Sequence, residues 1–318
     1  MKQALILTSA LLVLGIADAV PAGPNADEVR QLFRQLKDKD VGQRQLALRT
    51  LRELGPDDQE AVPALIEALN DQDPEIRQMA TNLLGNMGPT AVPALASALG
   101  YKDKIARRQA SIALAKIGPK AKDALPALSA ALRDDEPEIR GFVIGALVKI
   151  ETDRRQLAPL LKQALQDAER SVRISTLFAL EQPAVEDKDL LIVIASGLKD
   201  PDTEVRVATA AILSRMGPAA KDIIPNLRLA LKDKEGIVRV SAAQVLVTVD
   251  DEHTATVMPT LIDSLGDKQE EVRRAAAYVL GQIGPDAKPA VPALNKALKD
   301  DKATVRQAAA LALEKIGK

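Results

Sequence analysis

The sequence contains no cysteine, no tryptophan and one histidine, His253. Without cysteine the chain can form neither a disulfide nor a lipid-modified cysteine anchor. A single histidine with no cysteine also excludes the usual zinc and iron sites, which are built from several such ligands. Aromatic residues make up only 2% of the chain. Alanine and leucine must therefore supply the core, and stability has to come from close packing of helices.

The chain also lacks a strong charge of either sign. Charged residues make up 27% of the sequence, yet the formal net charge is −1, so no global field attracts nucleic acid or an anionic membrane. Neither a dinucleotide-binding nor a phosphate-loop glycine motif is present at a strand–helix junction. We interpret His253 as a solvated residue of an inter-repeat turn rather than as part of a catalytic triad. We expect no catalytic residue, no cofactor, no metal and no nucleic-acid partner.

Residues 1–19 differ in character from everything that follows. Lys2 precedes an uncharged run rich in Leu, Ile and Ala, residues 4–16, and an Ala-Asp-Ala cleavage pattern ends at residue 19. The run is shorter than the ~20 residues that span a membrane, which favours a cleaved secretory signal peptide over a retained anchor. Residues 20–25 form a short Pro/Gly linker. We expect an exported protein, periplasmic or secreted, with no membrane span after cleavage.

A unit of about 33 residues recurs nine times through residues 26–318 and can be numbered by one arginine per unit. These arginines are Arg44, Arg77, Arg107, Arg140, Arg173, Arg206, Arg239, Arg273 and Arg306. Leucine follows seven residues later in every unit, at Leu51, Leu84, Leu114, Leu147, Leu180, Leu213, Leu246, Leu280 and Leu313. A fixed period of this length is typical of a solenoid, in which each unit buries its apolar face against its neighbours.

Each unit is expected to contain two helices. The arginine lies in the second, where apolar residues recur at spacings of three and four on one helical face. Asp73-Pro74-Glu75 is typical of a helix start, and Gly-Pro pairs such as Gly118-Pro119 end these helices. The first helix carries Val-Pro-Ala-Leu or a relative, and we place its proline in the first turn or at a kink just after it, because only there is the missing N–H tolerated.

Tandem helix pairs with this sequence pattern resemble HEAT repeats, of the subtype named after phycobilisome (bilin) lyases. The resemblance covers the whole mature chain, residues 26–318, and implies an all-α solenoid of about nine two-helix repeats. It implies much less about function, since repeats of this kind serve many unrelated roles. In HEAT arrays the second helices line the concave surface.

An aspartate lies six residues before the arginine in eight of the nine units; the third has Tyr101 instead. A column of carboxylates and guanidiniums is compatible with ligand binding, but recurrence in every unit favours a structural ladder that closes the turns between repeats. We assign to this ladder Asp71, Arg77, Asp134, Arg140, Asp167, Arg173, Asp200, Arg206, Asp233, Arg239, Asp267, Arg273, Asp300 and Arg306.

The first, fifth and eighth residues after each arginine fall opposite the apolar face at 100° per residue. In the fourth to seventh repeats most of these positions are small or apolar, and contiguous apolar surface often marks a binding site. The alternative is that tight curvature buries them between repeats. The predicted partner-binding residues are Val148, Ile174, Phe178, Val207, Val240 and Val247.

These features predict a non-catalytic, exported scaffold that binds a protein or peptide of unknown identity on its concave face. A bilin-lyase-like protein or subunit is an alternative suggested by the repeat subtype alone. A self-assembling structural role is a third, because the last helix has no polar capping repeat after it and solenoid ends usually need one.

Overall fold

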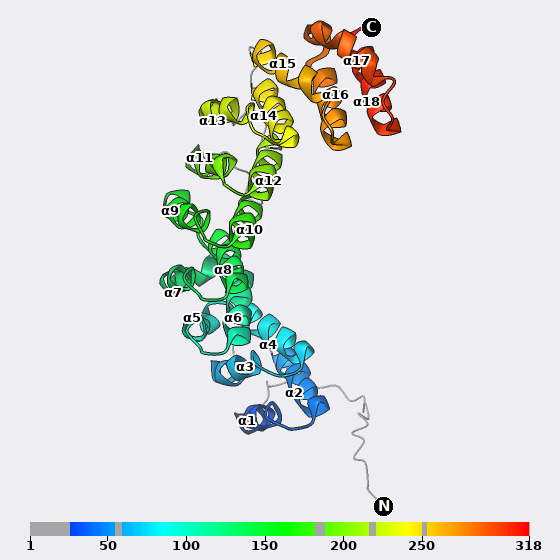
Figure 1. The fold of residues 1–318 in the computed structure, drawn as a ribbon. Coiled ribbons are helices and arrows are strands. Elements are labelled where there is room, and N and C mark those ends of the chain that lie inside the picture. Colours follow the sequence, from blue (N-terminus) through cyan, green and yellow to red (C-terminus); the bar gives the residue numbers. More distant parts are fainter. Residues whose placement is uncertain (1–25, 55–58, 182–187, 216–220, 250–252, 318) are drawn as a thin grey trace, which may run out of the picture.

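A computed structural model describes residues 26–54, 59–181, 188–215, 221–249 and 253–317. The expected signal peptide and linker, residues 1–25, lie outside these ranges. The described part consists of helices and turns, and the all-α solenoid predicted from the sequence is confirmed. Helix pairs stack one on another into an elongated, curved array (Figure 1).

The first helices of the pairs form one layer of the array. They are α1 (Ala26–Gln35), α3 (Val62–Ala68), α5 (Val92–Ala98), α7 (Leu125–Ala131), α9 (Arg154–Ala164), α11 (Lys188–Ser196), α13 (Ile224–Ala230), α15 (Thr254–Ser264) and α17 (Val291–Ala297). Short 3-10 segments lead into or out of several of them: η1 (Gln59–Ala61), η2 (Gly88–Ala91), η3 (Gly118–Ala124), η4 (Gly197–Lys199) and η7 (Gly284–Ala290).

The second helices form the other layer, and each packs on the second helix of the next repeat. They are α2 (Val41–Leu54), α4 (Pro74–Met87), α6 (Lys104–Ile117), α8 (Pro137–Ile150), α10 (Arg170–Glu181), α12 (Thr203–Ser214), α14 (Gly236–Val249), α16 (Glu270–Ile283) and α18 (Ala303–Ile316). Figure 1 shows these helices along the inner side of the arc and the first helices along its outer side. We call the side lined by the second helices the inner surface.

Local sequence signals account for the helix boundaries. The Asp73 side chain caps α4 by accepting the N–H groups of Glu75 and Ile76, and Pro74 occupies the first turn. Gly88, Gly118 and Gly284 end their helices at positive φ, which L side chains rarely adopt. The Gly-Pro pairs that begin at Gly55 and Gly217 lie outside the described residues.

The prolines of the first helices lie where the sequence analysis placed them. They occupy the first turn of α3, α5, α7, α13 and α17. In α9 and α15, which begin earlier relative to the motif, Pro159 and Pro259 lie just inside the helix. The core runs continuously between the two layers, and the leucine seven residues after each arginine is buried in all nine repeats.

Candidate functional site

The repeated arginines bridge adjacent repeats. Arg140 is typical: its Nε and Nη2 donate to the two carboxylate oxygens of Asp167 in the next repeat, each at 2.7 Å. Its Nη1 donates to the main-chain oxygen of Asp134 in its own repeat, also at 2.7 Å. Each guanidinium thus ties the turn of one repeat to the turn of the next. The same two-pronged contact joins Arg44 to Asp71, Arg107 to Asp134, Arg173 to Asp200, Arg206 to Asp233 and Arg273 to Asp300.

The aspartates of the ladder also organise the start of the second helices. Asp167 Oδ1 accepts the main-chain N–H of Glu169, two residues on, and the other ladder aspartates make the same contact. Burial raises the pKa of Asp167, but the hydrogen bonds from Arg140 and from the Glu169 N–H outweigh it, so this pKa lies below its usual value. For Asp300 the hydrogen bond from Arg273 is the largest effect and lowers the pKa strongly. These carboxylates are held ionised as structural partners of arginine.

The ladder is incomplete at three places. Arg77 faces the repeat in which Tyr101 replaces the aspartate, and it donates to main-chain oxygens of its own turn, at Asp71 and Gln72. Arg239 reaches Asp267 through Nη2 alone, at 3.2 Å. Arg306, in the ninth repeat, donates to the main-chain oxygens of Asp300 and Asp301.

On the inner surface, the fifth position after the arginine is exposed or half-buried in every repeat, whereas the first and eighth positions include fully buried residues. The first and eighth positions mostly lie in the seam between adjacent second helices; a Cβ on Gly281, for example, would lie 3.1 Å from Ala312 Cα. The fifth position faces away from this seam, and its residue type differs in all nine repeats. In order these residues are Arg49, Asn82, Ile112, Gly145, Phe178, Ala211, Gln244, Tyr278 and Leu311. We call them the inner line.

The predicted partner-binding residues differ in how exposed their side chains are. Phe178, on the inner line, is 53% exposed. Val148, Ile174, Val207 and Val247 are half-buried and pack against the core. The expectation of exposure is wrong for Val240, which is 1% exposed because α14 packs closely between α12 and α16. The structure therefore shows Phe178 as the one open member of a largely packed set.

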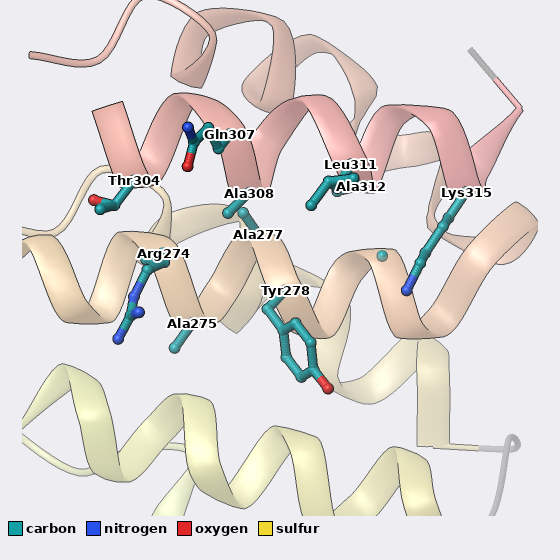
Figure 2. Close-up of a pocket in the computed structure, with 11 residues that line it drawn as sticks. Arg274, Ala275, Ala277, Tyr278, Thr304, Gln307, Ala308, Leu311, Ala312 and Lys315 are labelled. Atoms are coloured by element: carbon teal, nitrogen blue, oxygen red, sulfur yellow. The ribbon is translucent and has the colours of Figure 1, made fainter. Parts of the chain in front are cut away.

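A second region of the inner surface was not singled out from the sequence. A groove of about 460 Å³ lies between α16 and α18. Figure 2 shows Arg274 towards the N-terminal ends of the two helices, Lys315 towards their C-terminal ends, and Tyr278 and Leu311 between them. Tyr278 and Leu311 are 53% and 58% exposed. Small residues, among them Gly281 and Ala312, allow the close helix approach.

One signal for this groove was present in the sequence. Tyr278 and Leu311 are large side chains at consecutive fifth positions, but the polar neighbours Arg274 and Gln307 made this stretch look like ordinary solvated surface. Which of these side chains stay unpaired depends on contacts between repeats, and these are not visible in the sequence of a single repeat.

His253 is placed differently from the expectation. It is 8% exposed and stands at the N-terminal cap of α15, with Nε2 buried and without a hydrogen-bond partner. The expectation of a solvated turn is wrong because the helix begins at once, at Thr254, and carries this residue into the packed layer.

The described residues were also compared with the requirements of a metal site and of a membrane span. Across the described ranges, no group of three or more His, Asp or Glu side chains is arranged to hold a metal ion. None of the helices that the structure describes combines the length and apolar character needed to cross a membrane.

Comparison with solved structures shows the same architecture elsewhere. The chain matches Kap95p in a structure with RanGDP at a TM-score of 0.66 and 14% identity, over 93% of this chain and 46% of that one. It matches a Kap95:Nup1 complex at 0.64 and 13%, again over 93% and 46%. This chain thus spans about half the length of those proteins. An engineered protein is 22% identical over 91% of this chain and 89% of its own, at a TM-score of 0.48. Curated proteins gave no significant match.

The family model for HEAT repeats matches residues 26–115, 92–181 and 258–318, which is more than half of the chain. The matched segments contain the ladder pairs from Arg44 to Asp167, the Arg273–Asp300 pair and the groove between α16 and α18. This chain belongs to the HEAT-repeat family.

Proposed function

We propose that this protein is a non-catalytic scaffold that binds a protein partner along the inner surface of its solenoid. One observation carries the proposal: Phe178, Tyr278 and Leu311 are large side chains of the inner line and are each more than half exposed. Exposed aromatic and large apolar side chains on a broad surface are typical anchors of protein interfaces.

The fold comparison adds support of a general kind. Both Kap95 structures contain a solenoid of this fold in complex with another protein, RanGDP in one and Nup1 in the other. The curved array of this chain likewise offers an extended surface (Figure 1). Most of the ladder residues are engaged with one another, so binding falls to the residues that vary from repeat to repeat.

The test compares an inner with an outer exposed side chain. A photo-crosslinking amino acid is placed at Phe178 or at Leu229, which is 59% exposed on the outer helix α13. We expect the Phe178 position to yield one discrete crosslinked protein in the native host, and the Leu229 position to yield none. Phe178→Asp should abolish capture from a neighbouring inner position, whereas Leu229→Asp should not, with both variants retaining wild-type helicity. Equal capture from both faces would contradict the proposal.

We also propose that the scaffold acts outside the cytoplasm, on the strength of the apolar run and cleavage pattern in residues 1–19. Mass spectrometry of the protein from host fractions tests this. The expected form begins at Val20 and occurs in the periplasmic or secreted fraction. An uncleaved cytoplasmic chain would contradict it.

Self-association is a second candidate function, favoured by one observation. Leu298 is 38% exposed, whereas the equivalent leucine of each preceding repeat is at most 8% exposed: Leu36, Leu69, Leu99, Leu132, Leu165, Leu198, Leu231 and Leu265. A second copy seated on this edge of the described array would cover it. Light scattering should then show concentration-dependent association that Leu298→Lys abolishes; a monomer at all concentrations would contradict it. The bilin-lyase-like alternative stays an untested prediction.

A further inference from the structure

The groove between α16 and α18 has two structural counterparts in the same chain. In each of them, a cation that corresponds to one of the groove cations is paired. The first lies between α4 and α6. There Lys116 extends over Gly85 and donates from Nζ to Asn82 Oδ1 at 2.9 Å. The equivalent residues in the groove are Lys315, Gly281 and Tyr278, at the same offsets from their repeat arginines.

Tyrosine in place of asparagine leaves the groove lysine without its acceptor. The Tyr278 hydroxyl instead accepts a hydrogen bond from Gln282 Nε2 at 3.0 Å. Lys315 extends from α18 towards α16 (Figure 2), and within the described chain its ammonium group makes no hydrogen bond or ion pair. A strongly hydrated charge is therefore held at one end of an apolar groove.

The second counterpart lies between α6 and α8, where Arg108 is paired. Its guanidinium lies 3.3 Å from Glu138 and stacks over Phe142, 4.9 Å from the ring centre. Both partners are absent from the equivalent positions of the groove, which carry Thr304 and Ala308.

The groove arginine is consequently unpaired as well. Thr304 donates its hydroxyl to Glu270 in the first turn of α16, and neither Glu270 nor Glu271 of that turn forms an ion pair with Arg274. Arg274 forms no ion pair among the residues that the structure describes. The groove is thus lined by two unpaired cations, one towards each end, with Tyr278 and Leu311 between them and no acidic residue.

From this pattern we infer that the groove binds an extended acidic segment of a partner protein, with one apolar side chain flanked by two carboxylates. The inference rests on the proposed scaffold function and names its partner chemistry at this site. The carboxylates would meet Arg274 and Lys315, and the apolar side chain would lie against Tyr278 and Leu311. Charge complementarity selects such a segment over a basic or neutral one.

The spacing of the two cations sets the spacing of the carboxylates. Gln282 is the residue of α16 equivalent to Lys315, and it lies eight residues after Arg274. At 1.5 Å per residue the two side chains are attached about 12 Å apart along the helix axes. An extended peptide advances about 3.3 Å per residue, so about four residues cover this distance. Residues i, i+2 and i+4 of a strand share one face, which gives the pattern Glu-x-Leu-x-Glu.

The experiment measures binding of a fluorescent Glu-Ser-Leu-Ser-Glu peptide, blocked at both ends, to the full purified protein. We expect saturable binding at a Kd below about 1 mM that weakens with added salt. A Gln-Ser-Leu-Ser-Gln peptide should bind about tenfold more weakly, since each partly exposed charge pair contributes a modest amount. The protein variant Arg274→Gln with Lys315→Gln should lose binding by a similar factor.

Two further variants separate this site from general charge effects. Arg108→Gln with Lys116→Gln removes the same charge from the inner surface, at residues that are already paired, and should leave peptide affinity unchanged. Tyr278→Asn should weaken binding, because it gives Lys315 the acceptor that Lys116 already has in Asn82. Thermal melting checks that all variants stay folded.

The outcomes distinguish the site from the scaffold function. No binding of the Glu peptide, or equal binding of the Gln peptide, would overturn the groove assignment. So would equal losses in the two charge-removal variants. Either result leaves the scaffold proposal standing if the Phe178 position still captures a partner. Peptide binding without any crosslink at Phe178 would instead keep the groove and remove the proposed role of the central repeats.

Discussion

Arg140 and Asp167 form a two-pronged ion pair across the boundary between the fourth and fifth repeats, with both hydrogen bonds at 2.7 Å. Both side chains are close to nine-tenths buried. The pair is therefore shielded from solvent, and removal of one partner leaves the other as an isolated charge.

Arg140→Met should lower the free energy of unfolding by about 3 kcal/mol, because an unpaired, largely buried carboxylate is left behind. Adding Asp167→Asn, which keeps the turn acceptor but removes the charge, should recover part of this loss in a double-mutant cycle. Urea denaturation measures both. Arg170→Met is the matched control: its partner Glu204 also lies in the next repeat, but both are exposed, so the loss should stay below about 1 kcal/mol. Equal losses at the two sites would contradict a special role for the ladder.

Tyr101→Asp should stabilise the protein by up to about 1 kcal/mol by completing the ladder. Tyr101 stands at the turn position where other repeats carry the aspartate, and Arg77 has no carboxylate partner. The gain should vanish in an Arg77→Met background and should not be reproduced by Tyr101→Asn. A gain that is independent of Arg77 would show that removal of the exposed tyrosine is responsible.

Stability should fall in acid from about pH 4 downwards. The pKa values of Asp134, Asp167 and Asp300 are lowered in the folded protein, so the unfolded chain binds more protons below the usual carboxylate pKa of about 3.9. The stabilisation is present above that value and is lost as the pH falls through the folded pKa values. Thermal midpoints measured from pH 7 to pH 2 test this, and Asp167→Asn should reduce the slope. An unchanged slope would exclude this carboxylate as a contributor.

Gly145→Ala and Gly281→Ala should change stability in opposite directions, although both glycines lie inside second helices. A Cβ at Gly145 meets nothing within 4 Å, so alanine should stabilise by about 0.5–1 kcal/mol through reduced chain entropy. At Gly281 the Cβ lies 3.1 Å from Ala312 Cα, and the forced separation of α16 and α18 should cost about 1–3 kcal/mol. Denaturant midpoints measure both, and a gain at Gly281 would contradict the tight seam.

Much of the architecture was predictable because its causes are local or strictly periodic. The leucine seven residues after Arg140 marks the buried face, the Asp73 cap starts α4, and Gly118 ends α6. Each of these signals acts within one helix or at its end, so a single repeat is enough to reveal it.

The inner surface was less predictable, because its exposure depends on how two repeats meet. Helical angles alone made Val240 and Phe178 equivalent candidates, yet one is buried in the array and the other is open. Similarly, Lys116 and Lys315 occupy the same position of the repeat, and only the contact with Asn82 in the neighbouring helix separates a bound lysine from a free one.

The varied inner line has a consequence for how such a protein can change. Ion pairs such as Arg140–Asp167 link successive repeats at their turns, whereas the fifth position carries nine different residue types over the same frame. Repeats contact only their neighbours, so each inner-line residue can be exchanged with little effect on distant repeats. The array is in this sense modular: new specificity can be acquired one repeat at a time, and the side chain at Tyr278 can be replaced while the solenoid that presents it stays the same.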